Sequence, residues 1–245
     1  MPDNVGAQVA IVDYGMGNLF SIKQACEYVG LKPVITSSHK EIDRSEALIL
    51  PGVGAFGDAM DTLARLDLVD VLRDVAASPK PMLGICLGMQ LLMSASSEFG
   101  NHKGLGIIEG EVVSLKISFD GPRQIKVPQV GWNRIHPHSL GQTQTSTETT
   151  DTEGIIPPEW KSPLFKDLPD GEYMYFVHSY YTQPADSDVI MATTQYGSTK
   201  FCSSLRHNNV FGCQFHPERS GPSGLHIYRN LAQLISQLPF EAPHA

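Results

Sequence analysis

A cysteine flanked by glycines is the residue of this chain best suited to nucleophilic chemistry. Residues 80–93 contain a short apolar run, the turn GICLG around Cys86, and the start of an apolar helix. Small residues allow the sharp strand-to-helix turn on which a nucleophile can be exposed. A thiol at a helix N-terminus lies near unpaired N–H groups that favour its thiolate form. Cys86 is therefore a candidate nucleophile, and a buried structural cysteine is the alternative.

A histidine and a carboxylate near the C-terminal end could supply the matching base. His216 and Glu218 stand two residues apart, on either side of Pro217. At a strand end this spacing places both side chains on one face, so the carboxylate can bind one ring nitrogen and fix the tautomer. His178 is a rival base, but it has no carboxylate two residues later. A surface histidine beside an acidic residue is the alternative interpretation.

The loop PGVG at residues 51–54 could supply hydrogen-bond donors to an anionic intermediate, because glycines let backbone N–H groups turn toward a ligand. An ordinary strand-to-helix turn is the alternative. Two other glycine-rich loops, at residues 13–18 and 104–106, do not complete a dinucleotide-binding fingerprint, and the chain contains no G-x-x-x-x-G-K-[ST] motif.

These residues must be positioned by alternating strands and helices. Apolar runs and helical spacing predict strands at 8–13, 33–36, 47–50 and 81–85, and helices at 19–29, 55–65, 68–77 and 87–95. Such alternation is typical of a parallel, doubly wound α/β sheet. Sites in these sheets lie beyond the carboxyl ends of the strands, so the loops that contain Asp13, residues 51–54 and Cys86 should converge.

The second half of the chain has a different pattern. Strands of antiparallel or mixed sheet are expected at 107–115, 125–127, 132–136, 173–178, 189–194, 200–206 and 210–215, followed by a helix at 225–238. Residues 139–158 begin with a run rich in Thr, Gln and Ser, which predicts a mobile surface insertion. We expect residues 1–245 to form a single domain.

Composition narrows the class of protein. The 245 residues are 41% hydrophobic, enough for a sizeable core, and the net charge of −8 without a basic stripe argues against nucleic-acid binding. The four cysteines form no C-x-x-C pair, so neither a zinc ribbon nor a disulfide framework is indicated. No segment has the length of a membrane span, and no secretory leader is apparent. We expect a soluble, cytoplasmic protein.

Taken in order, the motifs resemble those of class I glutamine amidotransferases. The resemblance rests on PGVG, GICLGMQ and QFHPE, and it covers nearly the whole chain except residues 139–158. Within that family, DYGMGNL, PGVGAFGDAM, VGWN, YFVHSY and FHPERS are similar to the glutaminase subunits of imidazole glycerol phosphate synthases. Met89 supports this narrower resemblance, because many relatives that serve other synthases carry His after the elbow glycine.

The resemblance implies a three-layer α/β fold with a mostly parallel central sheet and mixed or antiparallel strands in its C-terminal half. It also implies a Cys86–His216–Glu218 triad that hydrolyses glutamine to glutamate and ammonia, without a metal or cofactor. Two further groups of residues are implied. Backbone groups of Gly52, Val53, Gly54 and Leu87 would bind the oxyanion, and Gln90, Glu98, Ser179 and Tyr180 would contact glutamine.

The implied partner is a (β/α)8 cyclase subunit that receives the ammonia and forms imidazole glycerol phosphate and AICAR in histidine biosynthesis. Three other functions stay open at this point. The chain could serve another synthase, such as anthranilate or carbamoyl phosphate synthase, or hydrolyse γ-glutamyl peptides. A non-catalytic scaffold of the same shape would be expected to lack a triad member, and all three are present.

Overall fold

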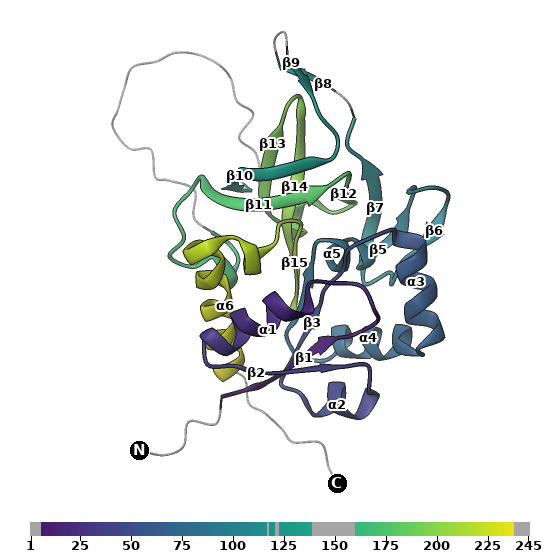
Figure 1. Cartoon of the computed structure of the whole chain (residues 1–245), viewed down its shortest axis with the longest axis vertical. Coiled ribbons are helices and arrows are strands. Elements are labelled where there is room, and N and C mark those ends of the chain that lie inside the picture. The colour runs from purple at the N-terminus through teal and green to yellow at the C-terminus, as the bar shows by residue number, and fades with distance from the viewer. Residues whose placement is uncertain (1–5, 117, 121–122, 139–159, 238–245) are drawn as a thin grey trace.

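A computed structural model describes residues 6–116, 118–120, 123–138 and 160–237 of the chain (Figure 1). The expected insertion at 139–158 lies outside the described residues. In chain order the elements are β1 Gln8–Val12, α1 Leu19–Tyr28, β2 Lys32–Thr36, α2 His39–Arg44, β3 Ala47–Leu50, α3 Phe56–Arg65, α4 Leu68–Ala77, β4 Met82–Ile85, α5 Leu87–Leu91, β5 Met93–Ser96, β6 His102–Lys103, β7 Ile108–Ser114, β8 Ser118–Asp120, β9 Arg123–Ile125, β10 Gln129–Pro137, β11 Glu172–His178, β12 Tyr180–Pro184, β13 Ile190–Tyr196, β14 Thr199–His207, β15 Val210–Cys213 and α6 Gly221–Ser236, with short 3-10 turns η1 Pro163–Phe165, η2 Ser187–Val189 and η3 Pro217–Arg219.

A nine-stranded sheet runs through the molecule in the order β11-β10-β13-β14-β15-β4-β3-β1-β2. The pairs from β15 through β4, β3 and β1 to β2 are parallel, whereas the pairs from β11 through β10, β13 and β14 to β15 are antiparallel. The expected change from parallel to antiparallel strands is confirmed. A second sheet has the order β12-β7-β5-β6, and β8 pairs with β9.

Alternate residues of the central strands face two separate hydrophobic layers. In β1, Val9 and Ile11 pack with side chains of α1 and α6, while Ala10 and Val12 pack with side chains of α3 and α4. This period of two, together with complete burial of both faces, explains why residues 9–12 of the strand are all apolar. Figure 1 shows α1 and α6 on the opposite side of the sheet from α3 and α4. The fold therefore has three layers.

The helix expected at 87–95 is shorter than its apolar pattern suggests. α5 ends at Leu91, and residues 93–95 belong to β5. The segment that follows takes over the carbonyl groups that would have continued the helix: Leu105 N–H donates to Leu91 O at 2.9 Å, and Ile107 and Ile108 N–H both donate to Leu92 O at 3.0 Å. These long-range bonds accompany the change from helix to strand, and the end of the apolar run becomes an inner strand of the second sheet.

Several predicted element boundaries were wrong by a few residues, and some short elements were missed. The strand predicted at 125–127 is found at Arg123–Ile125, and the final helix begins at Gly221, earlier than residue 225. The short elements α2, β6, β8 and β12 were not predicted. Among the described helices, none is both long and apolar enough to cross a membrane.

Candidate active site

Cys86 lies on a strained turn between β4 and α5. Its backbone has φ 54° and ψ −109°, a region that residues with side chains rarely occupy, and its N–H donates to Cys213 O at 2.7 Å. Two glycines make the turn possible. A Cβ added at Gly88 would lie 1.8 Å from Leu50 O, and one added at Gly84 would lie 2.8 Å from Gly88 O. The predicted sharp strand-to-helix turn at Cys86, which we call the elbow, is therefore present.

The predicted base comes from the strand beside the elbow. β15 pairs in parallel with β4, so the carboxyl ends of the two strands bring His216 and Cys86 together. His216 Nδ1 lies 2.8 Å from Glu218 Oε1, and both side chains are almost completely buried. His216 N–H donates to Tyr175 O at 2.9 Å, which ties this turn to β11. The pair is an oriented, solvent-excluded imidazole–carboxylate unit.

Two opposing effects set the charge of His216. Burial lowers its pKa, because an imidazolium ion is poorly solvated inside a protein. Interaction with the Cys86 side chain and the hydrogen bond with Glu218 favour the imidazolium and raise the pKa to about 10. His216 Nε2 is buried and has no hydrogen bond of standard geometry to any described residue. The protonated form of His216 is therefore favoured beside Cys86 and Glu218.

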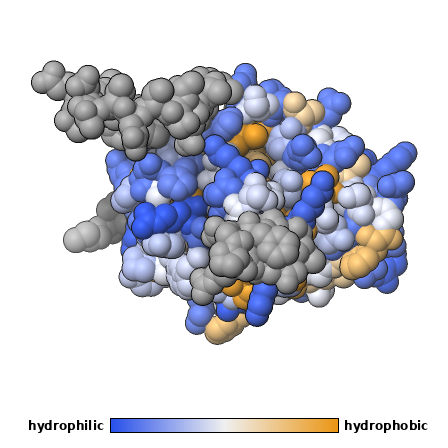
Figure 2. Space-filling model, turned by 90° about the horizontal axis from the view of Figure 1, so that it is seen from above, coloured by the Kyte–Doolittle hydropathy of each residue, from blue (hydrophilic) through white to orange (hydrophobic). Residues whose placement is uncertain are grey.

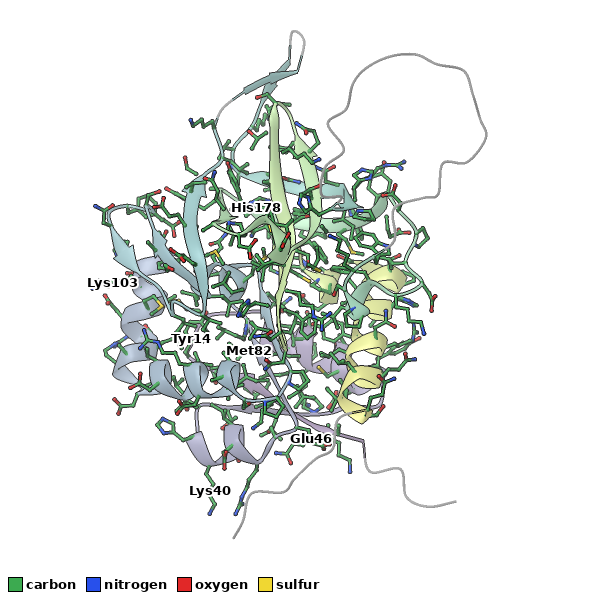
Figure 3. All side chains as sticks on the ribbon, turned by 180° about the vertical axis from the view of Figure 1, so that it is seen from behind. Tyr14, Lys40, Glu46, Met82, Lys103 and His178 are labelled. Atoms are coloured by element: carbon green, nitrogen blue, oxygen red, sulfur yellow. The ribbon has the colours of Figure 1, made fainter. Side chains whose placement is uncertain are left out.

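His178, the rival base, lies in a different environment. Burial lowers its pKa to about 4, and Nδ1 lies 2.9 Å from Tyr180 O. No ion pair joins this ring to a carboxylate within the described residues. His178 and Tyr14 are labelled in Figure 3. An imidazole with so low a pKa is a weak base at neutral pH, which favours His216 for the catalytic role.

The expected oxyanion-binding loop lies directly against the elbow. A Cβ added at Gly52 would lie 2.8 Å from Leu87 Cβ and 3.0 Å from Gly88 N. Leu87 is the first residue of α5, so its N–H has no acceptor within the helix. Val53 is exposed, and Gly54 has φ 110°, which favours glycine. The structure thus packs Gly52 against Leu87, next to Cys86, and Val53 and Gly54 continue the same loop; their binding of an oxyanion stays a prediction.

The four residues expected to contact glutamine are distributed around the same region. Gln90 Nε2 donates to Tyr180 O at 2.9 Å and to Gln214 Oε1 at 3.1 Å, so its amide links α5 to β12. Ser179 O accepts a hydrogen bond from Leu115 N–H at 2.7 Å. Glu98 is buried, and its Oε2 accepts a hydrogen bond from Phe56 N–H at 2.7 Å. Each of the four therefore has a described structural contact, and their contact with substrate stays a prediction.

Two groups near the thiol were missed by the sequence reasoning. Gln214 is fully buried and its Nε2 lies 3.7 Å from Cys86 Sγ, while Val177 O lies 3.7 Å from the same sulfur on another side. Gln214 could have been found, because it precedes His216 by two residues and so shares its face in extended chain. Val177 contacts the sulfur through its backbone carbonyl. Every residue has a backbone carbonyl, so the type of side chain could not have predicted this contact.

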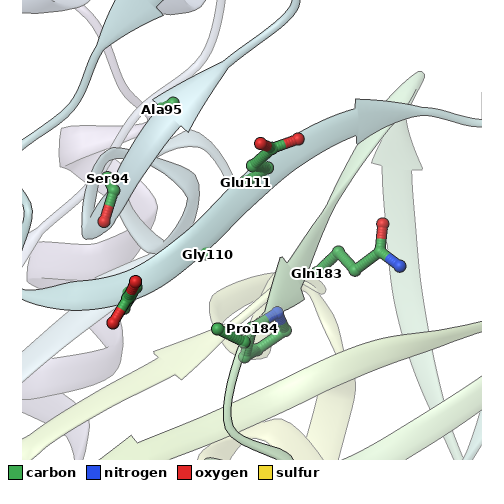
Figure 4. A pocket seen from close by; sticks show the side chains of 8 residues that line it. Ser94, Ala95, Gly110, Glu111, Gln183 and Pro184 are labelled. Carbon is green, nitrogen blue, oxygen red and sulfur yellow. The ribbon is translucent and has the colours of Figure 1, made fainter.

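A separate groove of about 600 Å³ lies on the second sheet (Figure 4). Its lining comes from β5, β7, β12 and the residue after β12: Ser94, Ala95, Glu109, Gly110, Glu111, Gln183, Pro184 and Ala185. None of these is a triad residue or a predicted glutamine contact. Within the described part of the chain, no group of three or more His, Cys, Asp and Glu side chains could hold a metal ion.

Similar proteins carry this sequence pattern over nearly their full length. The chain is 43% identical over 230 residues to the imidazole glycerol phosphate synthase subunit HisH of Caldanaerobacter subterraneus subsp. tengcongensis, covering 94% of this chain and all of that protein. It is 41% identical over 227 residues to the protein of the same name from Bacillus cereus strain B4264, covering 93% and 95% of the two chains.

Solved structures share the fold at lower sequence identity. PurLQS from Thermotoga maritima aligns with a TM-score of 0.66 at 19% identity, covering 93% of this chain and 98% of that one. A glutamine amidotransferase from the same organism aligns with a TM-score of 0.54 at 13% identity, covering 96% of this chain and 87% of that one. The family model described as glutamine amidotransferase class-I matches residues 10–233. With its three-layer α/β fold, the chain belongs to the class-I glutamine amidotransferase family.

Proposed function

We propose that this chain is the glutaminase subunit of an imidazole glycerol phosphate synthase. One observation carries the proposal: a buried His216–Glu218 pair interacts with Cys86 at the elbow between β4 and α5. The names of the relatives that are about 40% identical support the choice of synthase. We also propose that the enzyme works in the cytoplasm and that residues 1–245 form one domain.

The first half of the reaction is acyl transfer to sulfur. The Cys86 thiolate attacks the side-chain amide carbon of glutamine and forms a tetrahedral oxyanion. His216, charged through its contacts with Cys86 and Glu218, gives its proton to the amide nitrogen, so that ammonia leaves and a glutamyl thioester remains. Glu218 keeps the ring oriented during this transfer.

The second half is hydrolysis of the thioester. The neutral His216 ring takes a proton from water, the hydroxide adds to the thioester carbon, and the C–S bond breaks to release glutamate and regenerate the thiolate. Backbone N–H groups of Leu87 and of the loop at Gly52, Val53 and Gly54 stabilise both oxyanions. Removal of a single donor of this kind typically costs about 10²–10³ in rate.

Glutamine is held by residues that surround the elbow. Gln90, Glu98, Ser179 and Tyr180 take this role in the proposal. Their placement supports it, since the amide of Gln90 contacts Tyr180 O, and Glu98 is bonded to the residue that begins the helix after the oxyanion loop.

The proposed partner is a (β/α)8 cyclase subunit that uses the released ammonia to convert a phosphoribulosyl-formimino aminoimidazole carboxamide ribonucleotide into imidazole glycerol phosphate and AICAR. An exposed aromatic surface beside the site supports docking there. Along β10 and β11, the outward side chains include Val130, Trp132 and Tyr173, which are exposed, while alternate residues such as Met174 and Phe176 are buried.

This surface is connected to the nucleophile through strand pairing. Val130 stands opposite Val177, whose carbonyl contacts Cys86 Sγ, and Trp132 stands opposite Tyr175 with ring centroids 6.0 Å apart. Arg219, beside the triad, lies over the Tyr175 ring at 4.5 Å. We define the docking surface as Val130, Trp132, Tyr173 and Tyr175. A partner bound here would sit close to the release point of ammonia.

Substitution of the nucleophile tests the proposal. In the reconstituted pair with the cyclase, Cys86→Ala should abolish glutamine-dependent synthesis and leave synthesis from added ammonium salt intact. Cys26→Ala is the matched control: it removes a different buried thiol, which lies on α1, and it should retain both reactions. Loss of both reactions in Cys86→Ala would refute this division of labour. Strong turnover of γ-glutamyl peptides by the isolated wild-type chain would favour a hydrolase.

A further inference from the structure

The oxyanion loop is held at its start by a phenol from another part of the chain. Tyr14, which follows β1, is buried, and its hydroxyl donates to Pro51 O at 2.8 Å. Burial raises the pKa of Tyr14 far above its usual value, and the negative charge of Cys86 adds to the effect. The hydroxyl therefore keeps its proton and remains a donor throughout the working pH range.

The far end of the loop is held by a carboxylate. Phe56 is the first residue of α3, and the preceding residue, Ala55, makes no side-chain hydrogen bond that could cap the helix. Glu98 supplies the missing acceptor from 42 residues away, with Oε2 at 2.7 Å from Phe56 N. A carboxylate at a helix N-terminus is also favoured by the helix dipole.

Between these two contacts, the loop is packed more tightly at Gly52 than at Gly54. Gly52 is closely packed, since an added Cβ would lie 2.5 Å from Tyr14 Oη and 2.8 Å from Leu87 Cβ. Gly54 is open by comparison: the nearest atom to its added Cβ, among the described residues, is Met16 Sδ at 3.9 Å. The neighbouring side chain of Val53 is 44% exposed.

We propose that Tyr14 and Glu98 are positioning residues that hold the two ends of the oxyanion loop in place, Tyr14 through Pro51 O and Glu98 through Phe56 N–H. The inference rests on the proposed function, in which this loop binds the oxyanion. Glu98 has a second role in it. Because Oε2 is engaged by Phe56 N–H, Oε1 is the oxygen that binds the ammonium group of glutamine, so that one carboxylate links substrate binding to the position of the loop.

A set of four variants in the complex with the cyclase tests these two contacts through kcat and KM for glutamine. Tyr14→Phe should lower kcat about 10-fold with little change in KM, since it loosens the loop without touching substrate. Glu98→Gln retains an oxygen that accepts from Phe56 N–H but lacks the charge. It should raise KM about 10-fold and leave kcat within about 3-fold, whereas Glu98→Ala should worsen both.

Glu46→Ala is the matched control. Glu46 Oε1 also accepts a long-range backbone hydrogen bond, from Gln8 N–H at 3.0 Å, but at the amino end of β1, away from the elbow. Figure 3 shows Glu46 toward the same end of the molecule as Lys40 and away from His178. This variant should lose stability in thermal unfolding and keep the wild-type kcat and KM.

A second readout separates loop position from damage to the nucleophile. Alkylation of Cys86 by iodoacetamide needs no oxyanion donor, so its rate should be unchanged in Tyr14→Phe and Glu98→Ala while glutamine turnover falls. The proposal is overturned by a wild-type kcat in Tyr14→Phe, or by equal losses of kcat in Glu98→Gln and Glu98→Ala. If Tyr14→Phe does not fold, the Glu98 pair decides. Absence of glutamine turnover in the wild-type complex would instead refute the proposed function.

Discussion

At the scale of single residues, the backbone of Cys86 departs from the conformations preferred by residues with side chains. A positive φ of this kind costs about 1–3 kcal/mol and persists only where the surroundings impose it. Here the N–H of Cys86 is held by Cys213 O, and glycines on both sides allow close approach of β3 and α5. The strain places the thiol at the helix N-terminus, within reach of His216.

We expect the Glu218 carboxylate to affect catalysis by orienting the His216 ring. Glu218→Gln replaces an acceptor of the Nδ1 proton by an amide and removes the charge that helps to raise the pKa of His216. We expect kcat for glutamine hydrolysis to fall by about 10²–10⁴, with KM changed far less.

Steady-state kinetics of the complex would measure this effect, and far-UV circular dichroism would verify the fold. A Glu218→Gln enzyme that retains more than a tenth of the wild-type kcat would argue against an orienting carboxylate.

At the scale of elements, the elbow depends on how closely α5 approaches β3. The Gly88 Cα lies so near Leu50 O that an added methyl group would fall 1.8 Å from it, and both partners are backbone. Neither Gly88 nor Leu50 can move without displacing α5 or β3. Close packing here is therefore a condition for the site as well as for the fold.

Gly88→Ala should consequently destabilise the protein by at least about 3 kcal/mol or prevent folding. Gly30→Ala is the matched control, because Gly30 also lies in a turn beside a helix, with φ 87°, but no described atom lies within 4 Å of its added Cβ. It should cost only about 1 kcal/mol. Urea unfolding of both variants measures the difference, and equal costs would show that the close approach is relieved.

His178 on β11 should make the fold sensitive to acid. Burial lowers its pKa to about 4, against 6.5 for an unperturbed ring, so below pH 6.5 the unfolded chain takes up the proton more readily. The contribution of His178 to the free energy of unfolding is therefore highest above pH 6.5, where the ring is neutral in both states, and it falls progressively as pH decreases toward 4. From the two pKa values, it decreases by about 2 kcal/mol between pH 8 and pH 5.

Urea unfolding of the wild type and of His178→Asn at both pH values would test this sensitivity. The asparagine amide can still donate to Tyr180 O but does not titrate. The free energy of unfolding of His178→Asn should therefore decrease less between pH 8 and pH 5 than that of the wild type. An identical pH dependence in the two proteins would contradict the assignment.

At the scale of the whole molecule, the antiparallel end of the sheet presents the proposed docking surface beside the candidate active site. Viewed from above, the coloured part of the surface is mainly hydrophilic, with separate hydrophobic areas between the hydrophilic ones (Figure 2). Exposed aromatic side chains are the kind of residue that dominates protein–protein binding energies. Their alignment on β10 and β11 connects a partner to the carbonyl that contacts Cys86.

Trp132→Ala should weaken association with the cyclase about 10- to 30-fold without lowering the stability of the isolated chain, because the side chain is 55% exposed. Tyr28→Ala is the control: Tyr28 is 67% exposed, but it ends α1 and lies outside the docking surface. Isothermal titration calorimetry would give both affinities. Equal affinities for wild type and Trp132→Ala would place the interface elsewhere.

Local sequence was enough to predict much of the catalytic centre. The glycines around Cys86, the two-residue spacing of His216 and Glu218, and the strand-helix alternation each act through near neighbours, and near neighbours are visible in sequence. The same holds for the change from parallel to antiparallel strands, because burial on two faces and burial on one face produce different patterns of apolar residues.

Only the tertiary structure decided which distant groups meet. The end of α5 at Leu91 depends on donors from residues 105–108, and the cap of α3 comes from Glu98. The contacts of the thiol come from Gln214, which follows β15, and from Val177 of β11. Such contacts are set by the order of strands in the sheet. Strand order follows from the packing of the complete chain, so no local pattern of residues specifies it.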